Sequence, residues 1–360
     1  MKNSDFTSNY SNRILSNTNF KIQSPSNIAL VKYWGKRDPQ IPLNASISFT
    51  LSNCHSTTEM QVSPRMDFDG KYSFDMWFEG EEKPSFRPKI EQFFERIEDY
   101  IPFLKDFHFV FKSSNSFPHS SGIASSASGM SAIASCLMEV EKELNPGMSN
   151  EMLLRKTSFL SRLGSGSACR SLEGPLVVWG EHPEIPGSSD LFGVKFPFEV
   201  SKVFEDYQDT ILLVDKGEKK VSSTLGHNLM VGHPFAEQRF EQAQRNLGLL
   251  TEVLQNGDLD KFMNIVESEA LSLHAMMMTS NPYFILMKPH TLSILEKVWE
   301  YREQTGKHLC FTLDAGANVH LLYPASEKEE VLAFIEQDLV AFCQKNHYIC
   351  DSTGLGARSL

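Results

Sequence analysis

The chain has 360 residues, a hydrophobic share of 41% and a formal net charge of −11. This composition is ordinary for a globular protein of one or two domains, and the acidic balance disfavours nucleic acid and anionic membranes as partners. The sequence shows no run of roughly 20 apolar residues, no secretory signal and no closely spaced cysteines, so we expect a cytoplasmic protein without a disulfide framework or zinc site.

The first half of the chain alternates strand and helix patterns. Residues 1–19 are polar and are predicted to form a disordered lead-in. A short strand pattern, "NIALV", runs into the segment "KYWGK", and "FHFVFK" (107–112) alternates as a strand does. The predicted elements that follow are a helix over about 130–144 with apolar residues at helical spacing, a helix over 151–162 and a strand over 174–180.

The second half begins with a buried strand pattern at 209–217. Two further strands are predicted within 309–324, around the tight turn "DAGAN". Helical patterns cover about 234–255, 258–277, 290–305 and 326–344. Because strands and helices interleave in both halves, the fold class is α+β or α/β.

A serine-rich loop, "FPHSSGIASSASG", precedes the helix predicted at 130–144. A helix N-terminus offers unpaired N–H groups and the positive end of the helix dipole, and serine hydroxyls add neutral donors. The loop is therefore a candidate phosphate site, although it lacks the "GK[ST]" of a Walker loop. The alternative is a helix start with one capping serine.

Three other segments carry candidate ligand groups. In "SPSNIALVKYWGKRD", Lys32 and Lys36 flank two aromatic residues and could reach one anion, or could form the polar rim of the core. In "GSGSACRS", Arg170 could bind a carboxylate or phosphate through two hydrogen bonds, or could be a surface residue after a helix end. Asp314 in "DAGAN" could act as a general base or could stabilise its own turn.

Together these segments resemble the diphosphomevalonate decarboxylases, members of the GHMP kinase superfamily. The resemblance rests on "PSNIALVKYWGKRD" followed by "PLNASISFTLS", on "FPHSSGIASSASG", on "GSGSACRS" ahead of "GPLVVWG", and on "DAGAN". All occur in the family's order and cover most of residues 20–325. "KYWGKRD" and "GSGSACRS" are specific to this branch, whereas "P-x-x-x-G-x-x-S-S-A" is shared by many GHMP kinases.

The resemblance implies an α+β fold of the GHMP kinase type. Residues 20–190 would form an N-terminal lobe that resembles ribosomal protein S5 domain 2, contains a left-handed β-α-β unit, and binds ATP and substrate. Residues 191–360 would form a ferredoxin-like lobe that carries the catalytic aspartate. The implied reaction is that of a carboxy-lyase in isoprenoid biosynthesis: ATP, Mg²⁺ and mevalonate 5-diphosphate yield isopentenyl diphosphate, CO₂, ADP and phosphate.

The resemblance also assigns roles to individual residues. Asp314 would orient and deprotonate the tertiary hydroxyl of the substrate, with Lys32 and Arg170 beside it. ATP would be held by Ser120, Ser121, Gly122, Ser125, Ser126 and Ser128. The anionic groups of the substrate would be held by Tyr33, Lys36, Ser165, Ser167, Arg170, Ser223 and Thr224. The family also allows a homodimer, and the sequence identifies no metal ligands.

The sequence departs from the family pattern at two places. Ala317 stands where the family usually has proline, and His227-Asn228 stands where it usually has methionine, often followed by a basic residue. Near the presumed diphosphate, a histidine that titrates near pH 6.5 would restore charge, unless it caps a helix or points to solvent. The alternatives are a mevalonate or phosphomevalonate 3-kinase and a monophosphate decarboxylase. A nucleotide-binding pseudoenzyme is disfavoured because the candidate base, Asp314, is retained.

Overall fold

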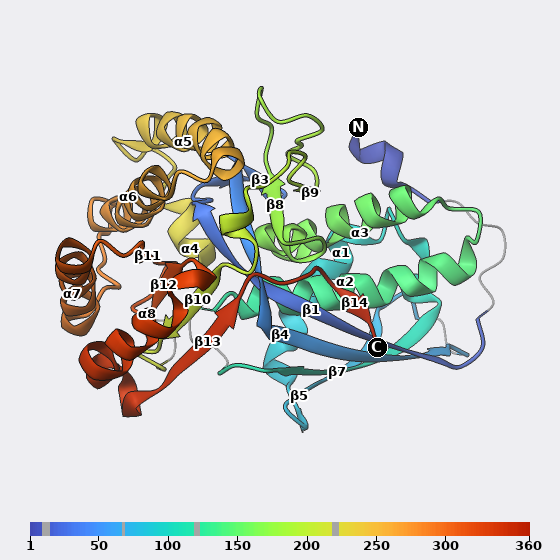
Figure 1. The fold of residues 1–360 in the computed structure, drawn as a ribbon. Coiled ribbons are helices and arrows are strands. Elements are labelled where there is room, and N and C mark those ends of the chain that lie inside the picture. The colour runs from blue at the N-terminus through green and yellow to red at the C-terminus, as the bar shows by residue number, and fades with distance from the viewer. Residues whose placement is uncertain (9–14, 67–68, 119–122, 218–222) are drawn as a thin grey trace.

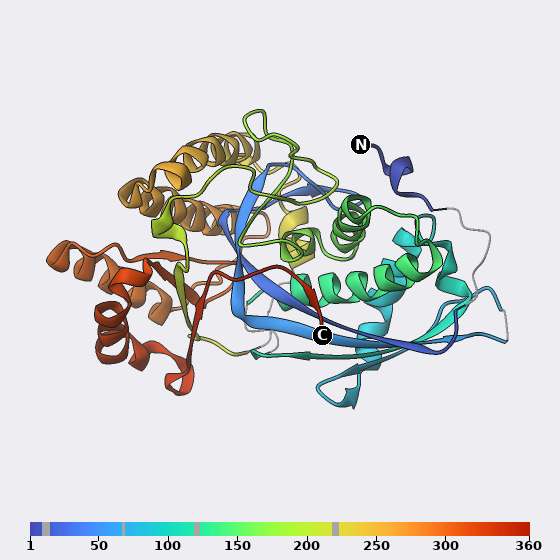
Figure 2. The same cartoon turned by 45° about the vertical axis from the view of Figure 1, so that its right-hand side comes forward.

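The computed structural model describes residues 1–8, 15–66, 69–118, 123–217 and 223–360. In Figures 1 and 2 the N-terminal and C-terminal halves form two lobes that lie side by side. Among the described helices, none combines the length and apolarity that a membrane crossing requires.

The N-terminal lobe is built on a sheet in the order β14-β1-β4-β7-β5-β6, with β8 pairing to β4 and β9 to β8. Two long strands dominate it, because β1 (Thr18–Val31) pairs antiparallel with β4 (Ser46–Pro64). Side chains of β5 and β7 are buried alternately, as expected for a sheet with one covered face. The remaining strands are β5 (Ser73–Phe78), β6 (Glu81–Glu82), β7 (Phe107–Asn115), β8 (Leu176–Trp179), β9 (Val194–Lys195) and β14 (Arg358–Ser359).

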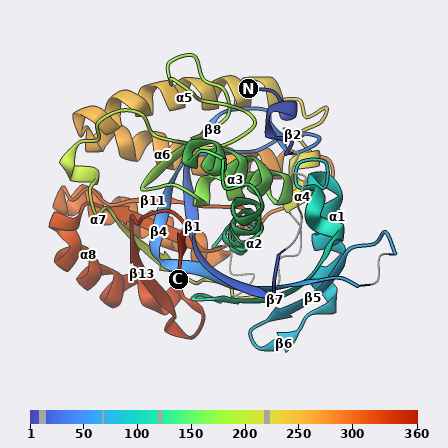
Figure 3. The same cartoon turned by 90° about the vertical axis from the view of Figure 1, so that its right-hand side faces the viewer.

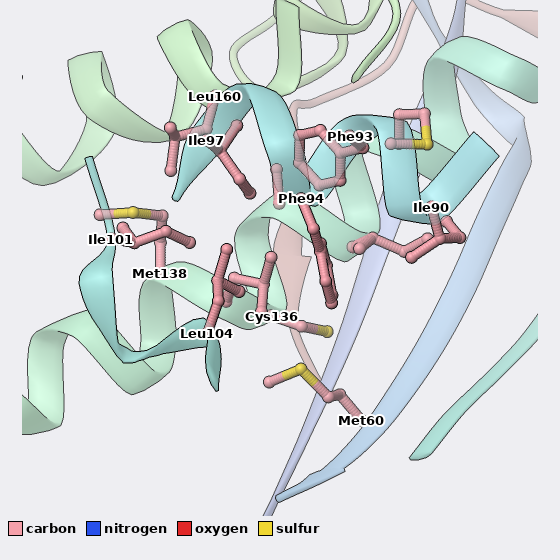
Figure 4. Packing of buried hydrophobic residues seen from close by; sticks show 14 of the residues in the cluster. Met60, Ile90, Phe93, Phe94, Ile97, Ile101, Leu104, Cys136, Met138 and Leu160 are labelled. Atoms are coloured by element: carbon pink, nitrogen blue, oxygen red, sulfur yellow. The ribbon is translucent and has the colours of Figure 1, made fainter. Parts of the chain in front are cut away.

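Three helices lie over this sheet: α1 (Arg87–Ile97), α2 (Ser125–Leu144) and α3 (Asn150–Gly164). Figure 3 looks along α2 and α3, which lie on the same side of the sheet. In Figure 4, Phe94 and Ile97 of α1 point into a core that also contains Cys136 and Leu160. Each fully buried side chain of this size contributes about 1.5–3 kcal/mol.

The C-terminal lobe contains an antiparallel sheet in the order β11-β12-β10-β13. Its strands are β10 (Gln208–Leu212), β11 (Cys310–Thr312), β12 (Val319–Tyr323) and β13 (Tyr348–Ser352). Its helices are α5 (Ala236–Asn256), α6 (Leu259–Met278), α7 (Pro289–Thr305) and α8 (Lys328–Phe334).

Shorter elements lie between these strands and helices along the chain. A hairpin of β2 (Lys36–Arg37) and β3 (Ile41–Pro42) follows β1, and α4 (Ser223–Asn228) precedes α5. The short helical turns are η1 (Asn3–Phe6), η2 (Pro84–Phe86), η3 (Pro102–Lys105), η4 (Gly166–Ser171), η5 (Lys202–Phe204), η6 (Ala325–Glu327), η7 (Ile335–Leu339), η8 (Val340–Phe342) and η9 (Gln344–Asn346).

One hydrophobic cluster is shared by the two lobes. It joins Leu30 of β1 and Phe49 of β4 to Leu247 of α5 and Phe262 of α6, all buried. The chain end also returns to the first lobe, where β14 lies beside β1 in Figure 1, and Arg358 pairs with Gln23. The C-terminal lobe was predicted to span residues 191–360. Its last strand, β14, thus belongs to the sheet of the N-terminal lobe.

The predicted helices at 151–162, 234–255, 258–277 and 290–305 are confirmed as α3, α5, α6 and α7, and the two strands around "DAGAN" as β11 and β12. The helix predicted at 326–344 is divided, because α8 ends at Phe334 and a π-helical turn, Ile335–Leu339, follows it. The short strand predicted at "NIALV" is only the end of β1. Buried Ser24 and Ser26 interrupt the apolar pattern upstream, and the Ser26 hydroxyl donates to the Ile123 carbonyl at 2.7 Å.

Part of the lead-in predicted to be disordered is instead held against the first lobe. Asn3–Phe6 form η1, and the buried Phe6 ring stacks on Phe159 with centroids 4.3 Å apart. Lys156 Nζ donates to the Ser8 hydroxyl at 2.6 Å and to Glu141 at 3.0 Å. The polar composition of the segment hid the contacts of Phe6 with Phe159 and Phe192, which tertiary packing makes favourable.

Candidate active site

A cavity of about 790 Å³ is lined by residues of both lobes. The loop after β1, the start of α2, η4, α1, α4 and the β11–β12 turn all contribute to its wall. The predicted site residues that line it are Lys32, Tyr33, Lys36, Ser125, Ser126, Ser165, Ser167, Arg170 and Asp314. Residues Ser120, Ser121 and Gly122, and the side chains of Ser223 and Thr224, lie outside the described part of the chain.

An ion pair forms one wall of the cavity. Lys32 Nζ donates to Asp314 Oδ1 at 3.0 Å, and the two side chains are 2% and 29% exposed. Burial lowers the pKa of Lys32, and the Asp314 carboxylate opposes that shift. The Asp314 carboxylate is therefore accessible to a ligand in the cavity, whereas the Lys32 ammonium that pairs with it is buried.

Helix α6 supports both members of this pair through their backbone. The buried Glu269 carboxylate accepts the Lys32 backbone N–H at 2.8 Å and forms an ion pair with Arg239. His274 Nε2 donates to the Asp314 carbonyl at 3.1 Å. Burial lowers the pKa of His274 to about 4, so the ring stays neutral at physiological pH. Two side chains of one helix thus fix the relative position of lysine and aspartate.

Arg170 is buried at the end of η4. Its Nη1 donates to the Ser46 hydroxyl at 2.6 Å, and its guanidinium carbon lies 5.7 Å from the Trp179 ring centroid. Within the described residues, Arg170 Nε and the Tyr33 hydroxyl are buried without a hydrogen-bond partner. Burial lowers the pKa of Arg170 and raises that of Tyr33. The alternative of a surface arginine after a helix end is wrong.

Lys36 and the η4 serines complete the predicted anion-binding wall. Lys36 Nζ donates to Gln40 Oε1 at 2.8 Å, and burial together with Arg96 lowers the pKa of Lys36. Ser165 and Ser167 line the cavity, and the Ser167 carbonyl accepts from Asn27 Nδ2 at 3.2 Å. The site therefore gathers cations and hydroxyl donors, which suits a ligand rich in anionic oxygens.

The serine loop contributes two different kinds of residue. Ser125 and Ser126 begin α2 and line the cavity, and the Ser126 hydroxyl accepts a hydrogen bond from Lys89 Nζ. Ser128 is fully buried and bonds the Ser56 hydroxyl of β4 at 2.7 Å. The expectation that Ser128 binds ATP is therefore corrected: its position on the helix directs it toward the sheet.

His227 lies in the cavity wall, but it does not carry the expected charge. Its Nδ1 accepts the Gly35 backbone N–H at 2.9 Å. Burial, followed by the charges of Lys36 and Arg170, lowers the pKa of His227 to about 3. The hypothesis that His227 gains a proton between pH 6 and pH 8 is therefore wrong, and so is the alternative that it points to solvent.

Sequence reasoning missed the contribution of α1. Lys89, Gln92 and Arg96 line the cavity, whereas Phe93 and Phe94 of the same helix are buried in the core. The three polar residues recur at i, i+3 and i+7, which is the spacing of one helix face. That periodicity was a readable signal, because the polar stripe adjoins an apolar face and carries two cations.

Comparisons with known proteins identify the family of this chain. Residues 24–190 match the model of the diphosphomevalonate decarboxylase-like N-terminal domain, and residues 210–355 match that of the mevalonate 5-diphosphate decarboxylase C-terminal domain. The diphosphomevalonate decarboxylase of Ganoderma lucidum is 30% identical over 334 residues, covering 87% of this chain and 80% of the relative.

Solved structures give the same result. The mevalonate diphosphate decarboxylase of Staphylococcus aureus matches with a TM-score of 0.81 and 26% identity, covering 96% of this chain and 98% of its own. A structure of MDDEF in complex with MVAPP, AMPPCP and magnesium matches with a TM-score of 0.80 and 24% identity, covering 96% and 99% of the two chains, and this likeness shows a shared fold. The α+β architecture is that of the GHMP kinase fold, and this chain belongs to the diphosphomevalonate decarboxylase family.

Proposed function

We propose that this protein catalyses the ATP-dependent decarboxylation of mevalonate 5-diphosphate to isopentenyl diphosphate, CO₂, ADP and phosphate. The observation that carries the proposal is the Lys32–Asp314 pair in the wall of a cavity that also presents Lys36 and Arg170. The carboxylate can accept a proton from a substrate hydroxyl, and the cations can hold carboxylate and phosphate groups.

In this proposal Asp314 orients the tertiary hydroxyl of the substrate toward the γ-phosphate of ATP and accepts its proton. The hydroxyl oxygen bonds to phosphorus, and ADP leaves. The C–O bond then breaks with release of phosphate, positive charge develops on that carbon, and loss of CO₂ supplies the electron pair of the new double bond. Tyr33, Lys36, Ser165, Ser167 and Arg170 would hold the anionic groups of the substrate.

ATP would be held by the serine loop and by Lys89, with which Ser126 already forms a hydrogen bond. No cluster of three or more histidine, cysteine or acidic side chains occurs among the described residues. Such a cluster is not required, because Mg²⁺ at nucleotide sites is bound largely by phosphates and water. Ser125 and Ser126 hydroxyls would complete its ligands, and the ion would neutralise charge on the phosphates. A cytoplasmic location and a homodimer also belong to this proposal.

The test is a substrate panel of mevalonate, its 5-phosphate and its 5-diphosphate, each with MgATP. CO₂ release and ADP formation are measured in the same reactions. We expect both products in equal amounts, with the 5-diphosphate as the preferred substrate. ADP formed without CO₂ would indicate a 3-kinase, and a preference for the 5-phosphate would indicate a monophosphate decarboxylase.

A matched pair of serine variants tests the placement of ATP. Ser126→Ala should raise the KM for MgATP several-fold and leave the KM of the other substrate largely unchanged, because Ser126, unlike Ser128, lines the cavity. Ser128→Ala should leave both KM values unchanged and should lower the free energy of unfolding by about 0.5–1.5 kcal/mol, since one buried hydrogen bond is lost while the Ser56 hydroxyl keeps its bond to Asn115 Oδ1. Steady-state kinetics and denaturant unfolding distinguish the two effects. Normal MgATP kinetics in Ser126→Ala would show that the Ser126 hydroxyl does not bind the nucleotide.

A further inference from the structure

The imidazole of His227 is held in a fixed orientation between two aromatic rings. Its ring centroid lies 4.2 Å from that of Tyr33 and 4.7 Å from that of Trp34, and the residue is 8% exposed. Gly35 follows these rings with φ +102°, which is readily adopted by glycine. The backbone bend at Gly35 directs its N–H to His227 Nδ1 at 2.9 Å.

This contact decides which nitrogen carries the proton. A backbone N–H can only donate, so Nδ1 of His227 must be the acceptor and the neutral ring must carry hydrogen on Nε2. Across the part of the chain that the structure describes, Nε2 has no hydrogen-bond partner, although His227 lines the cavity. A buried ring therefore retains one unused donor at the ligand site.

The surroundings of the ring favour a neutral donor and an anionic acceptor. Lys36 and Arg170 are the charged groups that act on His227, and they add to the effect of burial on its pKa. Protonation would also remove the acceptor that holds Gly35. The same two cations attract negative oxygens to this part of the cavity, so an acceptor for Nε2 is most favourably a phosphate or carboxylate oxygen.

We propose that His227 is a specificity-determining residue whose neutral Nε2–H donates a hydrogen bond to a phosphate oxygen of the substrate. The inference rests on the proposed function, because it requires the phosphorylated end of the substrate in this part of the cavity. His227 thus binds the phosphate through a hydrogen bond and adds no positive charge to the site. Its contribution to binding is constant between pH 6 and pH 8.

Two substitutions separate the roles of the two ring nitrogens. His227→Asn keeps an acceptor near Nδ1 for the Gly35 N–H and is too short to reach the position of Nε2. His227→Gln places an amide donor near Nε2. We expect the dissociation constants of mevalonate 5-diphosphate and of inorganic pyrophosphate, measured by calorimetry, to rise about tenfold or more in His227→Asn and by a smaller factor in His227→Gln. His290→Asn, at an exposed histidine of α7, is the matched control and should bind as the wild type does. Binding by His227→Asn within about twofold of the wild type would overturn the proposal.

Nitrogen-15 NMR of the wild-type histidine rings provides a second test, in which His227→Gln serves only to assign the His227 signal. The His227 signal should show hydrogen on Nε2, should not titrate between pH 6 and pH 8, and should shift when pyrophosphate is added. Hydrogen on Nδ1, or titration in that range, would overturn the proposal. If the wild type released no CO₂ while this signal still shifted with pyrophosphate, the proposed function would fail and the assignment of His227 would stand. If CO₂ were released but the signal did not shift with mevalonate 5-diphosphate, the proposed role of His227 would be wrong and the proposed function would stand.

Discussion

Asp314→Asn should reduce turnover by about 10²–10⁴, the usual contribution of a general base, and should leave the affinity for ATP nearly unchanged. Asparagine keeps the size of the side chain, and its amide oxygen can still accept from Lys32 Nζ, which lies 3.0 Å from Oδ1. The variant therefore removes the negative charge and the proton acceptor without opening the cavity wall. Turnover is measured as CO₂ release, and ATP binding by calorimetry.

A surface carboxylate supplies the control for this substitution. Asp338 forms a 4.0 Å ion pair with Lys297 and is 47% exposed. Asp338→Asn should leave turnover unchanged, because Asp338 does not line the cavity, and exposed ion pairs of this kind also contribute little to stability. Near-normal CO₂ release by purified Asp314→Asn, with an unchanged unfolding midpoint, would show that Asp314 is not the base.

Arg170→Lys should lower kcat/KM at least about tenfold. The lysine keeps a positive charge but loses the planar fork that can bind two oxygens at once, and one hydrogen bond to a charged group contributes about 1.5–3 kcal/mol. The structure leaves Arg170 Nε without a partner among the described residues while Nη1 binds Ser46. A ligand oxygen at Nε would complete its hydrogen bonding.

Arg302→Lys is the matched control, since Arg302 pairs with Glu267 in the C-terminal lobe and does not line the cavity. It should change stability without changing kcat/KM. Steady-state kinetics on both variants, each checked by thermal unfolding, distinguish a loss of substrate binding from a loss of stability. An unchanged kcat/KM in Arg170→Lys would restrict Arg170 to its structural bond with Ser46.

The elements that the sequence predicted well are those whose signals are local. Apolar residues recurring at helical spacing identified α2, and the small residues of "DAGAN" identified the turn that carries Asp314. The motifs also identified Lys32, Arg170 and Asp314 through their resemblance to one family. The polar face of α1 was readable in the same way and was missed.

Other features depend on contacts that no local pattern contains. Lys32 and Asp314 are 282 residues apart and meet only because α6 and the shared core hold both lobes together. Ser126 and Ser128 are chemically identical in the sequence, yet one faces the cavity and the other bonds Ser56. The expected disorder near Phe6 failed because a distant ring, Phe159, covers it.

By itself, therefore, the sequence determined most of the longer helices, the turn that carries Asp314 and part of the cavity lining, because these follow from interactions between near neighbours and from family motifs. The tertiary structure alone decided which hydroxyls reach the cavity and whether His227 is charged. The physical reason is that burial and long-range charge set protonation and orientation. A histidine that would titrate near pH 6.5 in water is neutral here because Tyr33 and Trp34 enclose it and Lys36 and Arg170 oppose its protonation.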